Sequence, residues 1–209
     1  MGDFLVRGIV IGLLFGMPAG AVGAMTAQRT VSYGVKAGLL TGLGSSVADC
    51  IYACVGAFGL TLVSDFLLKY QAVLNLAGGS LLLWMGIRLL RAQSGKSNDA
   101  PDSITGGIRM FVSSFMVGIT NPAAVLTFLF AFSWFGISGR TGIAEGVCLV
   151  GGVFLGTYIW WGILSGAVAL ANKKVKKDYR KGMNRFFGIV LTLFGAVVLI
   201  RMLSLTSSI

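Results

Sequence analysis

The sequence predicts an all-α integral membrane protein whose six transmembrane helices form two inverted three-helix repeats. Composition is the first indication: 56% of the 209 residues are hydrophobic and 11% are charged, against roughly 25% charged residues in soluble domains. The second is the distribution of the charges, which leaves six long apolar stretches. The third is a polar segment that divides these stretches into three and three.

Crossing the hydrocarbon core of a bilayer takes a helix of about 20 residues. Five apolar stretches carry no charge, over residues 8–28, 70–87, 110–139, 146–172 and 186–200. The sixth, residues 37–68, contains only Asp49 and Asp65. The shortest stretch can still span the bilayer because Arg185 and Arg201 at its ends can extend their charged groups to the interface. We therefore expect spans over 5–26, 36–62, 67–91, 108–135, 142–171 and 184–205.

The halves of the chain echo each other. Gly16-Met17-Pro18-Ala19 is matched by Thr120-Asn121-Pro122-Ala123 at an offset of 104 residues, and Gly79 and Gly86 by Gly188 and Gly195 at an offset of 109. We expect a first repeat over 1–91, a polar cytoplasmic linker over 92–107 and a second repeat over 108–209, all in one membrane domain. With three spans per half, the second half enters the membrane from the opposite side, which is a recurring plan of secondary transporters.

The basic residues predict the orientation of the chain. Most of the 17 lie in the connections after the first, third and fifth spans: Arg29, Lys36, Arg88, Arg91, Lys96, Arg109, Lys173, Lys174, Lys176, Lys177, Arg180, Lys181 and Arg185. By the positive-inside rule these three connections are cytoplasmic and both termini lie outside. The net charge of +10 is thus explained by topology and contact with lipid headgroups, and no nucleic-acid partner is expected.

Asp49 is the one acidic residue deep within an expected span. An unpaired carboxylate is costly in hydrocarbon, so such residues face the bundle interior and often mark an ion or substrate path. Asp49 is therefore the candidate for proton coupling or for binding an ammonium group. The alternative is a protonated structural aspartate that hydrogen-bonds to Ser45 or Ser46, one turn earlier.

Pro18 and Pro122 lie near the middle of the first and fourth expected spans. A proline removes one backbone hydrogen bond and interrupts the helix, and the new helix N-terminus favours a carboxylate. Small neighbours such as Ala19 and Gly20 would let a ligand approach the backbone, and Asn121 adds an amide side chain. These five residues are candidate substrate-binding residues; ordinary proline kinks are the alternative.

The fifth span, the cysteines and the absence of enzyme motifs give three further expectations. Thr157 lies among Tyr158, Trp160 and Trp161 in the fifth span and is a further candidate for the wall of a substrate cavity, with simple packing as the alternative. Cys50 and Cys54 share a helix face and are expected to be small packing residues. No histidine and no phosphate-binding glycine loop with lysine is present, so we expect neither an enzyme nor a cofactor.

Several stretches together resemble the LysE family of amino-acid exporters, in its lysine and threonine/homoserine exporter sense. They are Gly16–Gly20 followed by Arg29 and Gly34–Gly38, Gly42–Asp49 closing with Phe58-Gly59-Leu60, Leu76–Gly79 running to Leu83–Arg88, and Phe115–Pro122 with an Asn-Pro motif. One departure is that many members read Pro-Gly-Pro in the first span, where this chain keeps Pro18 alone. The departure bears on substrate identity more than on fold.

The resemblance implies proton-driven export of small amino acids or similar metabolites across the bacterial inner membrane. The positions that match the family are Pro18, Asp49, Asn121 and Pro122, and a homodimer is expected by analogy. A divalent or heavy-metal cation exporter is the alternative function, although hard cations require several oxygen ligands. A thiol-based electron carrier and a non-transporting scaffold are more distant alternatives.

Overall fold

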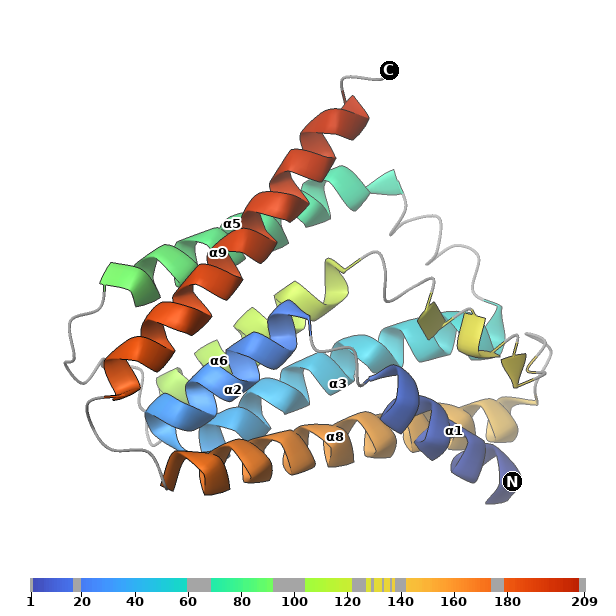
Figure 1. Cartoon of the computed structure of the whole chain (residues 1–209). Coiled ribbons are helices and arrows are strands. Elements are labelled where there is room, and N and C mark those ends of the chain that lie inside the picture. The colour runs from blue at the N-terminus through green and yellow to red at the C-terminus, as the bar shows by residue number, and fades with distance from the viewer. Residues whose placement is uncertain are drawn as a thin grey trace.

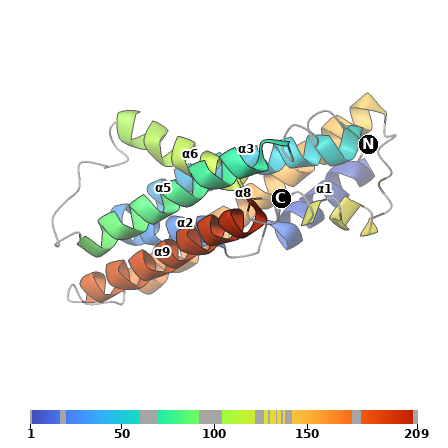
Figure 2. The same cartoon turned by 90° about the horizontal axis from the view of Figure 1, so that it is seen from above.

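The computed structural model describes residues 2–16, 20–59, 69–91, 104–121, 127–128, 130–132, 134–135, 137, 142–173 and 179–206. Within these residues the chain is all-helical (Figure 1). The helices are α1 Gly2–Phe15, α2 Ala21–Tyr33, α3 Val35–Phe58, α5 Gln71–Arg91, α6 Ile104–Ile119, α8 Ile143–Lys173 and α9 Tyr179–Thr206. Seen from above, the long helices follow a roughly common direction, as in a bundle (Figure 2).

Two expected spans are interrupted where the sequence places a proline. The first, 5–26, consists of two helices, because α1 ends at Phe15 and α2 begins at Ala21, and the described residues between them, Gly16 and Gly20, are not helical. The fourth, 108–135, contains α6, which ends at Ile119, just before Asn121. Pro18, Ala19 and Pro122 themselves lie outside the described residues.

Several helices are longer than the sequence predicts. α2 continues to Tyr33, seven residues beyond the expected end at 26, and α9 begins at Tyr179 rather than 184. α6 begins at Ile104, inside the range expected for the linker. By length and composition, α3 and the Ile143–Asn172 part of α8 are long and apolar enough to cross a membrane.

A tight turn joins α2 to α3. Gly34 is the single residue between them and has φ of +91°, a conformation that favours glycine. Its amide donates to the Thr30 carbonyl over 2.8 Å, which satisfies one carbonyl at the end of α2. At the far end, α8 is tied to α2 because the Asn172 amide donates to the Val31 carbonyl over 3.2 Å.

Glycines allow α1 and α8 to pack backbone against backbone. A Cβ atom at Gly8 would lie 2.9 Å from the Gly152 Cα, and a Cβ at Gly12 would lie 3.0 Å from the Gly156 Cα. Residue numbers rise together along the contact, so the two helices run parallel. Small residues at four-residue spacing permit this approach in membrane helices.

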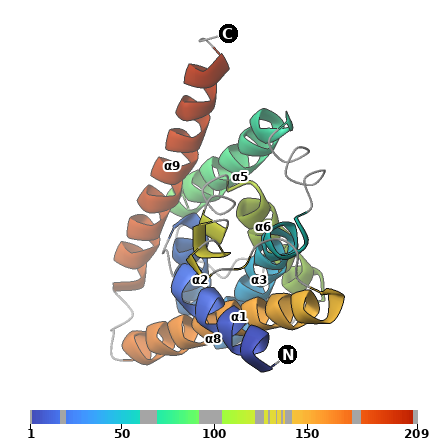
Figure 3. The ribbon, with the colours of Figure 1, turned by 90° about the vertical axis from the view of Figure 1, so that its right-hand side faces the viewer.

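α5 and α9 form a second pair at one edge of the molecule (Figures 1 and 3). Gly79 faces Leu199, while Gly86 faces Thr192 and Gly188. Residue numbers rise along one helix as they fall along the other, so this pair is antiparallel.

α3 is the central helix and contacts α2, α6 and α8 (Figure 3). Its Gly44 lies against Ser114, and its Ala48 lies against Gly118, so α3 and α6 run parallel. Gly42 lies against Trp161, whereas Phe58 lies against Gly146, so α3 and α8 are antiparallel.

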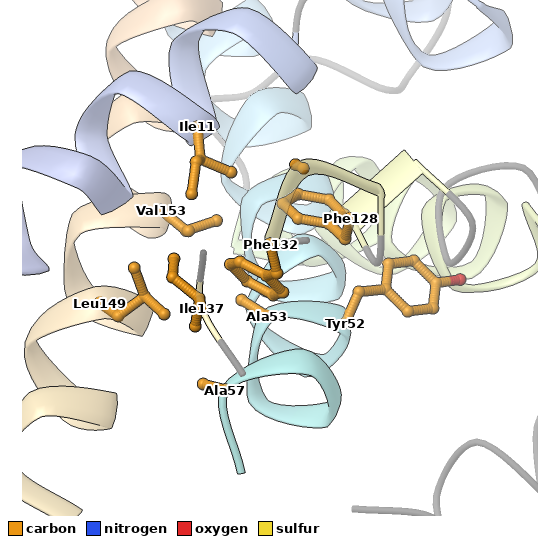
Figure 4. Close-up of a cluster of buried hydrophobic side chains, with 10 residues drawn as sticks. Ile11, Tyr52, Ala53, Ala57, Phe128, Phe132, Ile137, Leu149 and Val153 are labelled. Atoms are coloured by element: carbon orange, nitrogen blue, oxygen red, sulfur yellow. The ribbon is translucent and has the colours of Figure 1, made fainter. Parts of the chain in front are cut away.

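An apolar cluster fills the end of the bundle where α3 finishes and α8 begins (Figure 4). Its buried members are Ile11, Tyr52, Ala53, Ala57, Phe128, Ala131, Phe132, Ile137, Leu149 and Val153. The outer surface is also apolar: Trp134 and Ile143 are 75% and 80% exposed, and many large side chains of α9 face outward. Such a surface suits lipid contact.

Candidate functional site

A cavity of about 210 Å³ lies between the two helix interruptions. Gly16 and Gly20 line it from the first interruption, and Thr120 and Asn121 line it from the second. Asp49 of α3 contributes the one charged side chain among the described lining residues. A single water needs only about 10–15 Å³ of cavity volume, so this cavity has room for a solute of amino-acid size.

The first interruption presents a helix N-terminus to the cavity. Gly20 precedes α2 in an extended conformation (φ −81°, ψ −152°), and no side chain caps this end of the helix. Ala21 and Val22, whose amides belong to the first turn of α2, line the cavity. Amides in a first turn have no partner within the helix and favour an anion.

The second interruption is held by a tyrosine of α3. The Tyr52 hydroxyl lies 2.7 Å from the Ile119 carbonyl oxygen and 3.2 Å from the Gly118 carbonyl oxygen, at the C-terminal end of α6. Its hydroxyl points away from the apolar cluster that its ring helps to form (Figure 4). Tyr52 is not among the site residues that the sequence predicts, although it follows Asp49 by three residues on the same helix face.

Asp49 lies where the sequence predicts, inside the bundle. Its side chain is 9% exposed, and it lines the cavity together with Ser45. Among the described residues, no basic side chain forms an ion pair with Asp49. Ser46, a predicted alternative partner, has its hydroxyl 2.9 Å from the Thr157 hydroxyl instead.

Thr157 lies behind the site. It is fully buried, and its hydroxyl lies between the Ser46 hydroxyl and the Phe154 carbonyl oxygen. Its methyl group abuts Gly16, and Thr157 is not among the described residues that line the cavity. Of the predicted substrate-binding residues, Gly20 and Asn121 thus reach the cavity, whereas Thr157 supports the first interruption from the α8 side.

Arg29 is not in a connection, contrary to the sequence prediction. It is 6% exposed in α2, because that helix continues four residues beyond it. Its guanidinium donates to the Thr41 hydroxyl (3.0 Å), the Met110 carbonyl (2.9 Å) and the Ser113 hydroxyl (2.7 Å). Arg29 therefore joins α2 to α3 and α6. Arg29 belongs to the first stretch that resembles the LysE family, and this is the sequence feature that could have indicated a structural role for it.

The cysteines lie apart from the cavity. Cys50, Cys54 and Cys148 are free thiols of intermediate exposure, and none lines the described part of the cavity. Within the part of the chain that the structure describes, no group of three or more His, Cys, Asp or Glu side chains gathers in a way that could hold a metal ion.

Comparison with known proteins points to one family. The family described as "LysE type translocator" matches residues 13–202. The chain is 26% identical to the threonine efflux protein of Salmonella typhimurium and 24% identical to that of Escherichia coli K12, in both cases over 72% of this chain and 75% of the relative. It is 29% identical to the chemotactic transduction protein ChpE of Pseudomonas aeruginosa, over 73% of this chain and 75% of that protein. No solved structure matches significantly.

The matched range contains both helix interruptions, Asp49 and Arg29. A translocator family accounts for an apolar helical chain that encloses a cavity between two broken helices. The chain therefore belongs to the LysE family of translocators, which are membrane proteins.

Proposed function

We propose that this protein is a secondary transporter that exports small amino acids or similar metabolites from the cytoplasm, driven by protons. One observation carries the proposal: a buried carboxylate and an uncapped helix N-terminus line the same cavity, between two interrupted helices. Broken helices in membranes are tolerated where they are buried in protein or line a cavity, and they frequently form transporter sites.

The chemistry of the cavity suits a zwitterion. Asp49 can accept hydrogen bonds from an ammonium group, and the first-turn amides of α2 can donate to a carboxylate. Leu82, Val117 and Phe128 add apolar walls, and Thr120 adds a hydroxyl. Asp49 is the one charged group in the described lining, and it complements the α-amino group of an amino acid. The described lining has no second carboxylate to bind a cationic side chain, so the cavity suits a neutral amino acid.

Threonine is the natural first candidate. Two of the relatives are named as threonine efflux proteins, and a threonine side chain is small and carries both a methyl and a hydroxyl. The cavity offers both apolar and hydroxyl-bearing walls.

Helix packing supports an inverted repeat of six spans. In such a repeat the broken first span (α1 and α2) corresponds to the fourth span, which begins with α6, while α3 corresponds to α8 and α5 to α9. A two-fold axis in the membrane plane would then exchange the parallel pair α1/α8 with the parallel pair α6/α3. The same axis maps each antiparallel pair, α3/α8 and α5/α9, onto itself. All four pairs of this scheme occur as contacts with the required directions. We propose this architecture, with both termini outside and the basic connections cytoplasmic.

Proton coupling is proposed to act through Asp49. An ammonium group and a proton compete for the same carboxylate, so uptake of a proton from outside would release the amino acid. Exchange of one for the other would couple export to the proton gradient without a second ionisable group.

The oligomeric state that we propose, by analogy with the family, is a homodimer. Light scattering of the detergent-solubilised protein would measure it.

The test is flux in vesicles that contain the purified protein. Vesicles loaded with labelled threonine are expected to show efflux that a pH gradient accelerates, and Asp49→Asn is expected to abolish the acceleration. Glu145→Gln is the matched control, because Glu145 lies at the start of α8 away from the cavity. Wild-type vesicles that move no amino acid would overturn the proposal. Thermal stabilisation of the protein by metal ions, without stabilisation by amino acids, would favour a cation exporter instead.

A further inference from the structure

We infer that Arg88 and Arg109, which both contact the ring of Trp84, form a binding site for the phosphate of an anionic membrane lipid. None of the three is among the described residues that line the cavity, so the inference is independent of the transported substrate. It depends on three observations: two guanidinium groups at one exposed indole, the arrangement of α5 and α6, and an exposed apolar stripe on α6.

Two helices bring positive charge to Trp84. This tryptophan of α5 is 50% exposed. The Cζ atom of Arg88, one turn later on α5, lies 5.4 Å from the centroid of the ring, and the Cζ atom of Arg109 of α6 lies 5.5 Å from it. Both arginines are exposed. The three side chains therefore form one cluster at the surface, in which cation–π contacts hold two guanidinium groups at one ring.

The charges of this cluster suit an anion. Two guanidinium groups at one ring repel each other, and an anion that contacts both replaces this repulsion with attraction. A guanidinium presents its N–H donors in a planar fork that matches the oxygens of a phosphate. The ring contacts also restrict both side chains before the anion arrives, so less conformational entropy is lost on binding. Phosphate is therefore the chemical group that the two arginines would recognise.

The cluster lies where α5 and α6 diverge. The two helices are antiparallel, since Gly78 of α5 lies against Thr120 of α6, whereas Trp84 contacts Arg109. They separate toward the C-terminal end of α5 and the N-terminal end of α6 (Figures 1 and 2), and the Arg109 side chain reaches across to α5 there. In the proposed topology this end is cytoplasmic, and basic sites between transmembrane helices on that side bind lipid headgroups.

An apolar stripe on α6 favours a lipid over a free phosphate ion. Ile108, Val112 and Met116 follow each other at intervals of four residues, and all three are exposed. Residues at this spacing share one face of a helix, and Arg109 lies beside the start of the stripe. A phospholipid matches both parts, with its phosphate at the arginines and an acyl chain along the stripe. A free phosphate would use the arginines alone.

Four single variants separate a specific site from a general effect of charge. Arg88→Gln and Arg109→Gln each remove one guanidinium group of the site, and Trp84→Phe removes its indole. Lys36→Gln is the matched control. Lys36 is exposed in the first turn of α3, and because α3 and α6 run parallel, it lies at the same end of the bundle as Arg109.

The experiment measures the quenching of tryptophan fluorescence by brominated lipids in phosphatidylcholine vesicles that contain the purified protein. A small, equal fraction of the lipid is replaced by phosphatidylglycerol, which is anionic, or by phosphatidylcholine, each brominated high on the acyl chains. In the wild type, quenching is expected to show a preference of about tenfold for phosphatidylglycerol. The difference between the two lipids is expected to disappear in Trp84→Phe, because the selective contact is at this indole.

The arginine variants test which charges produce the preference. Arg88→Gln and Arg109→Gln are each expected to lower it about threefold or more, because each removes a charge that contacts the phosphate. Lys36→Gln is expected to lower it less than about 1.5-fold, because Lys36 acts only through the general surface potential. A loss of equal size in Lys36→Gln would overturn the inference. So would equal quenching by the two lipids in the wild type, a result that does not depend on the folding of any variant.

Inorganic phosphate distinguishes a lipid from a free ion. Sodium phosphate and sodium chloride at equal ionic strength are expected to lower the selective quenching equally, through screening alone. If phosphate abolishes the selective quenching and chloride does not, the site binds a free phosphate and the assignment to a lipid is wrong. None of these outcomes depends on amino-acid transport, so this inference and the proposed function are tested separately.

Discussion

The Thr157 hydroxyl of α8 lies 2.9 Å from the Ser46 hydroxyl of α3, directly behind the first helix interruption. The Thr157 methyl abuts Gly16, so this pair connects the two antiparallel helices to the point where α1 ends. The position of the interruption, and with it the N-terminus of α2, therefore depends on a contact outside the cavity.

Thr157→Val is predicted to test this positioning role. Valine keeps the shape and removes the hydroxyl, which leaves Ser46 without its partner and costs about 1 kcal/mol of stability. Transport is expected to fall through a higher KM for the amino acid, because the misplaced interruption weakens binding. Thr157→Ser, which keeps the hydroxyl and loses the methyl that meets Gly16, is the companion variant. An unchanged KM for Thr157→Val would show that Thr157 does not position the site.

Gly152 and Gly151 form a natural pair for testing the parallel α1/α8 contact. A Cβ at Gly152 would meet the Gly8 Cα at 2.9 Å and the Ile9 amide nitrogen at 3.0 Å, whereas nothing lies within 4 Å of a Cβ at Gly151. Gly152→Ala is predicted to destabilise the protein by about 1–3 kcal/mol through overpacking. Gly151→Ala is predicted to be neutral, or stabilising by up to about 1 kcal/mol through helix propensity. Thermal unfolding in detergent measures both, and similar melting temperatures would contradict the backbone contact.

The interruptions and the buried carboxylate could be predicted from the sequence because their causes are local. Proline removes an amide hydrogen wherever it stands, so Pro18 marks the end of α1. Asp49 lies thirteen residues after Lys36, the nearest charged residue on its N-terminal side. A carboxylate so deep in an apolar stretch faces the protein interior. Neither inference needs the tertiary structure.

The remaining features depend on which helices meet and in what register. A charge near the end of an apolar stretch indicates the end of a span, so the sequence predicts Arg29 in a connection. Its burial is favourable because side chains and a backbone carbonyl of α3 and α6 accept hydrogen bonds from the guanidinium. Likewise, the contact of Gly42 with Trp161 depends on how α3 packs against α8, and no local pattern separates Trp161 from Trp160.

Arg29 is predicted to hold α2 against its neighbours. Arg29→Lys keeps the charge, but a single ammonium cannot reproduce a fork that donates to Thr41, Met110 and Ser113. We expect a loss of about 2 kcal/mol or more, seen as a lower melting temperature. Lys36→Met, at an exposed position on α3, is the control and should change stability by less than about 0.5 kcal/mol. Equal melting temperatures for Arg29→Lys and wild type would mean that the three contacts contribute nothing net.

Gly42→Ala is predicted to damage the cavity without touching a polar group. The new methyl would overlap the Trp161 Cβ and Cγ atoms. These atoms are the base of a large side chain that lines the cavity, so α3 and Trp161 must move apart and the cavity must change shape. We expect weaker threonine binding, by about tenfold, together with a modest loss of stability of about 1–3 kcal/mol. Gly162→Ala is the control on α8, since a Cβ there meets only the Leu39 Cδ2 at 4.0 Å. Full affinity in Gly42→Ala would show that the Trp161 side chain yields without changing the binding space.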